Sequence, residues 1–93
     1  MLTEDCFFQA GNAPLLSGKG RIREVLVRFF GSVKAIRHEL NDYIESGNTA
    51  VYRGHVTCTR PDDSTLTVPV CDVFKLQGDK IEAYYIYIDW SAL

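Results

Sequence analysis

The stretch LTVPVCDVFKLQGDKIEAYYIYIDW, residues 66–90, decides the fold of this chain. It contains two long runs of β-branched and aromatic residues, and Gly78 and Asp79 between them are typical of a tight turn. The stretch therefore predicts a β-hairpin. One acid, Asp72, lies inside the first run among apolar neighbours. Because an unpaired carboxylate is costly to bury, Asp72 is the first candidate for a functional residue.

The residues before this hairpin continue the strand pattern toward the N-terminus. Residues 35–44 and 51–60 alternate or are rich in strand-forming residues, and turn signals lie at 46–48 and 61–64. Short connections between consecutive strands predict an antiparallel meander of four strands. A separate apolar run at residues 6–9 predicts a short additional strand.

A helix is expected over residues 20–33, where apolar residues recur with helical spacing. These residues are Ile22, Val25, Leu26, Phe29, Phe30 and Val33. One helix and four long strands predict the α+β class, with the helix on one face of a curved sheet. One helix cannot cover such a sheet, so we expect a homodimer in which a second copy covers the rest.

The composition excludes several classes of protein. The 93 residues predict a single domain over 1–93, and the 46% hydrophobic and 24% charged residues are ordinary for a globular protein. A net charge of −2 without a basic patch argues against a nucleic-acid partner. No apolar run approaches the roughly 20 residues of a membrane span. The first residues lack the charged and apolar segments of a signal peptide, so we expect a cytoplasmic protein.

The cysteines indicate neither a disulfide framework nor a metal site. Cys6, Cys58 and Cys71 are an odd number without a Cys-x-x-Cys motif, so we interpret them as reduced packing residues. Together with His38 and His55 they show no regular ligand spacing. We therefore expect no metal and no cofactor.

Several segments together resemble one known family. The segment QAGNAPLLSG at 9–18, the helix, DVF at 72–74, GDKI at 78–81 and YID at 87–89 are similar to the SnoaL-like branch of the nuclear-transport-factor-2-like superfamily. Ketosteroid isomerases, polyketide cyclases and limonene epoxide hydrolase are its catalytic relatives. The resemblance implies a cone-shaped, strongly curved antiparallel sheet (an α+β barrel, cystatin-like) around a pocket. Members usually begin with further helices, so it also implies an N-terminally shortened cone, by natural loss or by a boundary of the fragment.

Only some of the catalytic residues of the family have a counterpart in this chain. Asp72 falls where ketosteroid isomerases have a protonated aspartic acid, which donates a hydrogen bond because its apolar site raises its pKa. The base of these isomerases falls at Gln9, which cannot take a proton; it can bind a polar group of a ligand or satisfy backbone. The arginine and aspartate of the epoxide hydrolases fall at His55 and Thr57, and the acid of the hydrolases and cyclases falls at Ile86. Neither of these latter catalytic sets is present.

The resemblance also implies which residues line the pocket. Tyr84, Ile86 and Ile88 form one face of the last strand, which faces the pocket in the family, and Val70 on the preceding strand is expected beside them. The alternative is that both faces of this strand are ordinary core and interface packing.

Two interpretations of Asp72 remain open from the sequence. If residues 61–64 form a four-residue turn, Arg53 lies opposite Asp72, and a salt bridge between them would lower the pKa of the acid. If Asp72 instead faces a dry pocket, it can polarise a ligand. On the same register His55 lies diagonal to Asp72, where it is either an assisting base or an ordinary hydrogen-bonded histidine. We expect His38 to be a core or interface residue.

The sequence therefore predicts a pocket that binds a small, mostly apolar organic molecule. The catalytic version of this function is proton transfer of the isomerase, cyclase or hydrolase type, with Asp72 as polarising acid, His55 assisting, and Gln9 and Arg53 contacting the ligand. The alternative is a module without catalytic activity that binds a ligand or forms dimers.

Overall fold

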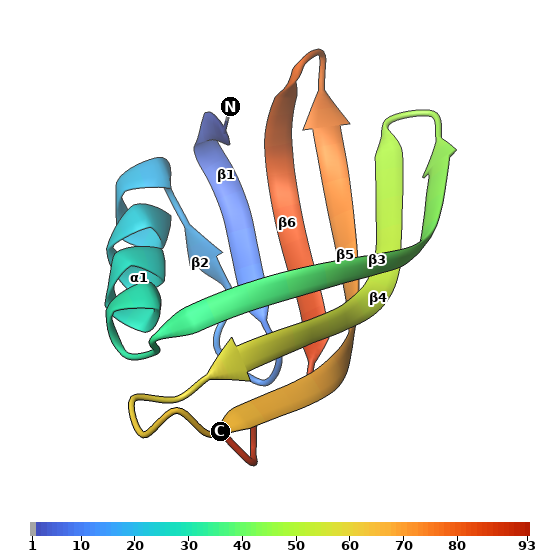
Figure 1. Cartoon of the computed structure of the whole chain (residues 1–93). Coiled ribbons are helices and arrows are strands. Elements are labelled where there is room, and N and C mark those ends of the chain that lie inside the picture. Colours follow the sequence, from blue (N-terminus) through green and yellow to red (C-terminus); the bar gives the residue numbers. More distant parts are fainter. Residues whose placement is uncertain (1) are drawn as a thin grey trace.

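The computed structural model describes residues 2–93, in which six strands form one sheet and one helix packs against it. The elements are β1 (Leu2–Ala10), β2 (Leu16–Ser17), α1 (Lys19–Gly31), β3 (Ala35–Ser46), β4 (Thr49–Thr59), β5 (Thr65–Gln77) and β6 (Lys80–Ile88). The strand order is β2-β1-β6-β5-β4-β3 (Figure 1). The predicted α+β class and the meander from β3 to β6 are confirmed.

The sheet is mixed, whereas a wholly antiparallel sheet was expected. β1 runs parallel to β6, with Phe8 beside Tyr84 and Ala10 beside Ile86. The chain passes through α1 and the whole meander before its last strand returns to β1. The sequence indicates β1 only by a short apolar run, and such a run does not reveal whether the strand pairs with its neighbour in a parallel or an antiparallel direction.

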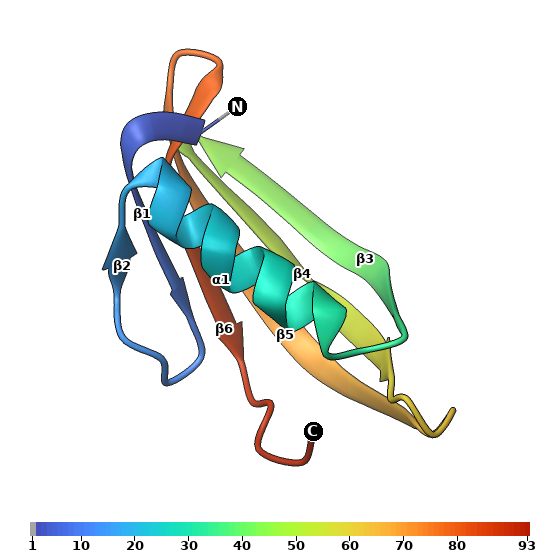
Figure 2. The ribbon, with the colours of Figure 1, turned by 90° about the vertical axis from the view of Figure 1, so that its left-hand side faces the viewer.

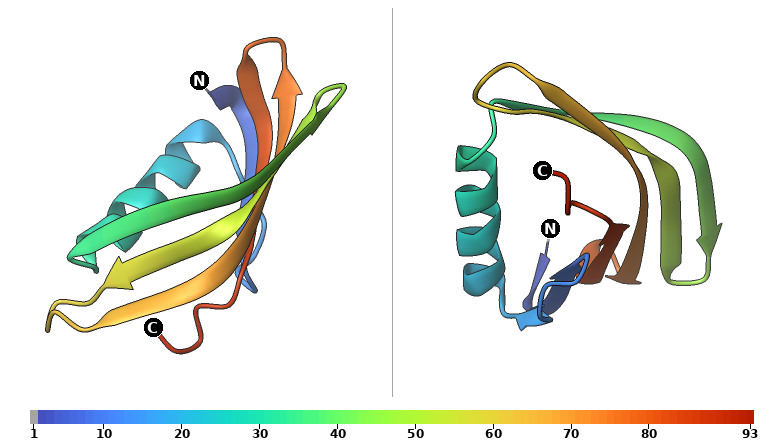
Figure 3. Two further views of the ribbon diagram at one scale, coloured as in Figure 1. Left: turned by 45° about the vertical axis from the view of Figure 1, so that its right-hand side comes forward. Right: turned by 90° about the horizontal axis from the view of Figure 1, so that it is seen from below.

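The sheet curves strongly around α1 but does not close into a barrel, since β2 and β3 are its two edges. Figures 2 and 3 show β3, β4 and β5 bending over one end of the helix. Two register shifts mark bulges, in which Asn41 of β3 and Glu82 of β6 are the extra residues. An extra residue on one strand bends it and increases its twist, which explains the curvature.

The well-buried core is small and lies where α1 meets β1. Ile22 of α1 is 2% exposed and packs with Cys6 and Phe8 of β1. Cys6 and Cys58 are buried free thiols, as predicted. Within residues 2–93 there is no helix with the length and apolar character needed to cross a bilayer. Because the core occupies only the junction of α1 and β1, much of the concave face of the sheet is left to line a cavity.

Candidate functional site

A cavity of about 260 Å³ lies between the concave face of the sheet and α1. β5 and β6 contribute alternate residues, because side chains on a strand point to opposite faces in turn. Among these are the four predicted pocket residues Val70, Tyr84, Ile86 and Ile88. α1 contributes apolar residues such as Leu26. The volume is near the lower end of the range for small-molecule pockets, and the wall is mostly apolar.

Asp72 lies in this wall, in the middle of β5. Its paired neighbours are Tyr52 on β4 and Ile86 on β6. Its Oδ1 atom is buried and has no hydrogen-bond partner among the described residues. Burial raises the pKa of the Asp72 carboxyl, and the charge of His38 and the hydroxyl of Tyr84 oppose this rise only in part. A carboxyl in this position favours its protonated form, which can donate a hydrogen bond.

Tyr84 is the phenol beside Asp72 on the same concave face. Its pKa is also raised, first by burial and then by the negative charge of Asp72. The negative charge of Asp72 therefore disfavours the ionised form of Tyr84, whereas the Tyr84 hydroxyl favours the ionised form of Asp72. Burial therefore shifts both the phenol and the carboxyl toward their protonated forms.

The prediction that Arg53 lies opposite Asp72 is wrong. A four-residue turn would place Arg60 opposite Thr65. The loop between β4 and β5 has five residues instead, so Thr59 pairs with Thr65. This single extra residue places Arg53 opposite Cys71 and so on the other face of the sheet. There Arg53 donates to Asp42, with its Nε 2.7 Å from Oδ2. Within residues 2–93, no arginine forms a salt bridge with Asp72.

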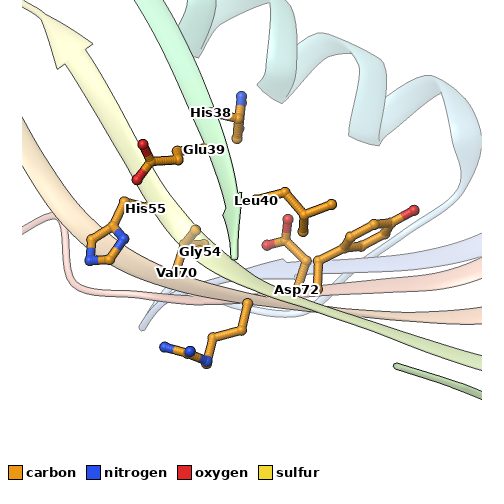
Figure 4. Close-up of a pocket in the computed structure, with 9 residues that line it drawn as sticks. His38, Glu39, Leu40, Gly54, His55, Val70 and Asp72 are labelled. Atoms are coloured by element: carbon orange, nitrogen blue, oxygen red, sulfur yellow. The ribbon is translucent and has the colours of Figure 1, made fainter. Parts of the chain in front are cut away.

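The same change of register removes His55 from Asp72. His55 pairs with Pro69, and its Nδ1 lies 3.0 Å from Oδ1 of Asn41. His55 thus lies on the opposite face of the sheet from Asp72, and Figure 4 shows the two side chains apart, with Gly54 and Val70 between them. The predicted pairing of these two side chains is therefore wrong.

Gln9 also lies outside the main cavity. Its side-chain Nε2 donates to the carbonyl oxygen of Ala13 at 3.0 Å, in the turn that follows β1. This contact corresponds to the second interpretation of Gln9, in which the side chain satisfies backbone.

His38 takes the place that the sequence assigned to His55. It lies on β3 opposite Val56 and lines the cavity together with Asp72. The alternation in β3 was visible in the sequence, but the bending of β3 over the helix was not. His38, Asp72 and Tyr84 are thus the ionisable side chains in a wall that is otherwise apolar or aromatic.

Five aromatic rings cross the concave face beside Asp72, one from each of five neighbouring strands. Ring centroids are separated by 4.8 Å for Tyr43 and Tyr52, 5.4 Å for Tyr52 and Phe74, 4.3 Å for Phe74 and Tyr84, and 5.5 Å for Tyr84 and Phe8. Such contacts stabilise the curved sheet and limit the movement of its side chains. The row therefore supports the wall in which Asp72 lies.

A second hollow of about 230 Å³ lies at the bulge of β3 (Figure 4). It is lined by His38 and Asp72 from the concave face and by Glu39 and His55 from the opposite face. β3 approaches β4 so closely here that a Cβ atom on Gly54 would lie 2.0 Å from the Glu39 carbonyl oxygen. Glycine at this position allows the bulge and hence the opening beside Asp72.

The described residues contain no group of three or more metal-ligating side chains.

Comparison with known proteins places this arrangement in a family. The family model for the SnoaL-like domain matches residues 1–84. The chain belongs to the SnoaL-like domain family. Some members of this family catalyse cyclase, isomerase or hydrolase reactions. The comparison with curated proteins finds no match.

Solved structures share the fold of this SnoaL-like domain at low sequence identity. An NTF2-like protein of unknown function from Burkholderia pseudomallei has a TM-score of 0.88 at 14% identity, over 98% of this chain and 75% of that one. TerC, crystallised with polyporic acid, has a TM-score of 0.84 at 18% identity, over 98% and 75%. An LEH-like epoxide hydrolase from Mycobacterium tuberculosis has a TM-score of 0.80 at 18% identity, over 95% and 65%.

Proposed function

We propose that the concave cavity binds a small, mostly apolar organic molecule with an oxygen atom that accepts a hydrogen bond from protonated Asp72. The observation that carries this proposal is the Oδ1 atom of Asp72, which is buried in an apolar wall without a partner. Leaving such an atom unpaired costs about 1–3 kcal/mol, and a ligand oxygen would recover this cost. The polyporic acid complex of TerC supports the choice of an organic ligand.

Proton transfer within this cavity is the catalytic form of the proposal. A carboxyl that donates to a carbonyl oxygen stabilises the negative charge that develops when a neighbouring C–H bond loses its proton. His38 lines the same cavity, and a neutral imidazole has a ring nitrogen that can accept that proton. His38 replaces His55 in this role because the register places His55 on the opposite face of the sheet from Asp72.

The binding proposal is tested with 2-tetralone, a bicyclic ketone, by isothermal titration calorimetry. Asp72→Val removes the donor, so we expect affinity to fall about 5- to 30-fold, the equivalent of one hydrogen bond of about 1–2 kcal/mol. Asp72→Asn keeps a donor and should retain most of the affinity. Asp42→Asn, on the opposite face, is the matched control. Equal affinity of the Asp72→Val variant and the unchanged protein would refute the role of Asp72.

The catalytic form is tested by exchange of the α-hydrogens of 2-tetralone in deuterated water, followed by proton NMR. We expect the protein to accelerate exchange and the His38→Gln variant to lose most of that acceleration, with binding retained. Binding without accelerated exchange would support the alternative, a ligand-binding module without catalysis.

Dimer formation is the second candidate function, and the opposite face of the sheet supports it. Phe7, Ile44 and Tyr87 are 42%, 62% and 62% exposed there. Large exposed apolar side chains on one face are typical of protein interfaces. We propose that a second copy of the chain covers this face.

The free thiols of Cys6 and Cys58 accord with a cytoplasmic location.

A further inference from the structure

The segment that follows β6 folds back on itself. The Ser91 amide donates to Oδ1 of Asp89 at 2.9 Å, and the Leu93 amide donates to the carbonyl oxygen of Trp90 at 2.9 Å. These two bonds close a turn around Trp90. The turn lies at the lower end of the sheet in Figure 1, and the view from below in Figure 3 places it across the opening between α1 and the sheet.

Arg60 joins this turn to the loop between β4 and β5. Its Nη2 donates to the carbonyl oxygen of Ala92 at 2.7 Å, and its Nε donates to that of Leu93 at 3.5 Å. Its Nη1 donates to the Ser64 hydroxyl at 3.2 Å. A planar guanidinium with several fixed donors holds two segments in one relative position better than a single flexible amine does.

The Trp90 ring lies against the end of α1. Its centroid is 5.9 Å from that of Phe29, and Phe29 is 5.8 Å from Phe30. All three rings line the cavity. Part of the cavity wall is therefore made of flat aromatic groups from α1 and from the segment after β6, which are far apart in sequence.

We propose that Trp90 selects flat aromatic ring systems as ligands of this cavity and that Arg60 is the residue that positions Trp90. This inference rests on the proposed binding function and names its ligand class. Aromatic rings gain about 0.5–1.5 kcal/mol from offset or edge contacts beyond the area they bury, whereas saturated rings of the same size do not. Asp72 contacts the ligand oxygen in either case, so the aromatic wall alone distinguishes the two classes.

The test compares 2-tetralone with 2-decalone, its saturated counterpart, by calorimetry. We expect the unchanged protein to prefer 2-tetralone and Trp90→Leu to reduce this preference about 2- to 10-fold. Arg60→Ala should reduce the preference in the same direction, and Arg60→Lys, which keeps the charge and one donor, should restore part of it. Arg53→Ala, which removes an exposed arginine on the opposite face, should leave the preference unchanged.

A second measurement tests the role of Arg60 without any ligand. Trp90 is the one tryptophan in the sequence, so quenching of the protein's tryptophan emission by acrylamide reports its exposure alone. We expect stronger quenching in Arg60→Ala than in Arg60→Lys or Arg53→Ala, with circular dichroism confirming that each variant is folded.

The outcomes separate this inference from the proposed function. An unchanged preference in Trp90→Leu overturns the ligand class, and unchanged quenching in Arg60→Ala overturns the positioning role. Failure of both ketones to bind the unchanged protein overturns the proposed function and the ligand class together, while the quenching result still decides the role of Arg60.

Discussion

Asp72 connects the stability of this domain to its proposed chemistry. The strand around it is apolar, its Oδ1 atom has no partner among the described residues, and the arginine once expected to neutralise it lies on the other face. The domain therefore bears a cost at this position when the carboxyl ionises. Such a cost is typical of a functional residue, because a simple structural role would be served better by an apolar side chain.

We predict that Asp72→Asn stabilises the folded protein at neutral pH. Because the pKa of Asp72 is raised in the folded state, folding favours the protonated form, and stability is lost as pH rises through the folded pKa. The asparagine side chain does not titrate. The extra stability of Asp72→Asn should therefore be absent at pH values below the ordinary pKa of 3.8 and should grow at higher pH. The gain should rise by up to about 1.4 kcal/mol per pH unit from 3.8 to the folded pKa and then level off, so its size measures how far the pKa of Asp72 is raised. Urea unfolding at a series of pH values measures it.

Asp62→Asn is the control with the opposite sign. Hydrogen bonds from Ser64 hold the pKa of Asp62 below its usual value, so its carboxylate stabilises the fold above that value and the effect is lost as pH falls. The Asp62 variant should therefore be the less stable protein at neutral pH. A pH-independent difference for Asp72→Asn would contradict the raised pKa.

At the scale of elements, two local irregularities build the site. The five-residue loop between β4 and β5 sets which face Arg53 occupies, and the bulge in β3 bends this strand over α1. Since side chains alternate along a strand, a shift of one residue moves each following side chain to the other face. The bulge depends on the close approach of β3 to Gly54, where there is no room for a side chain.

We predict that Gly54→Ala destabilises the domain by at least about 2 kcal/mol. The new Cβ atom would lie 2.0 Å from a backbone oxygen of Glu39, so the strand itself would have to move. Gly20→Ala is the matched control, because no heavy atom lies within 4 Å of a Cβ placed there and alanine favours the helix by up to about 1 kcal/mol. Urea unfolding compares the two variants. A Gly54→Ala variant as stable as the unchanged protein would show that β3 and β4 do not approach in this way.

At the scale of the whole molecule, one helix leaves much of a six-stranded sheet without cover. The concave face forms the cavity, and the opposite face carries exposed apolar side chains such as Tyr87 and Ile44. Contact between copies of the chain through this second face would remove these side chains from water.

We predict that the protein sediments as a dimer and that Tyr87→Glu converts it to a monomer. A charge buried in an apolar interface without a partner costs several kcal/mol, which is enough to separate the copies at micromolar concentration. Val27→Glu is the control, since Val27 is 65% exposed on α1, away from this face of the sheet. Sedimentation velocity distinguishes the states. A monomeric unchanged protein would refute the dimer and leave the binding proposal intact.

The sequence by itself determined the helix and the four-strand meander, and it singled out Asp72 as a candidate for function. These depend on local properties: apolar spacing at 3.6 or 2 residues, turn residues, and an acid among apolar neighbours. The pocket face of β6 was also predictable, because strand alternation is local.

Only the tertiary structure decided which side chains lie around Asp72. One additional loop residue removed Arg53 and His55 from the site, and the curvature of the sheet brought His38 to it. Trp90 lines the cavity, and the residues that follow it contact Arg60, which lies more than thirty positions earlier in the sequence. Register and curvature depend on bulges and on contacts between distant segments, and such contacts leave no periodic pattern in the sequence.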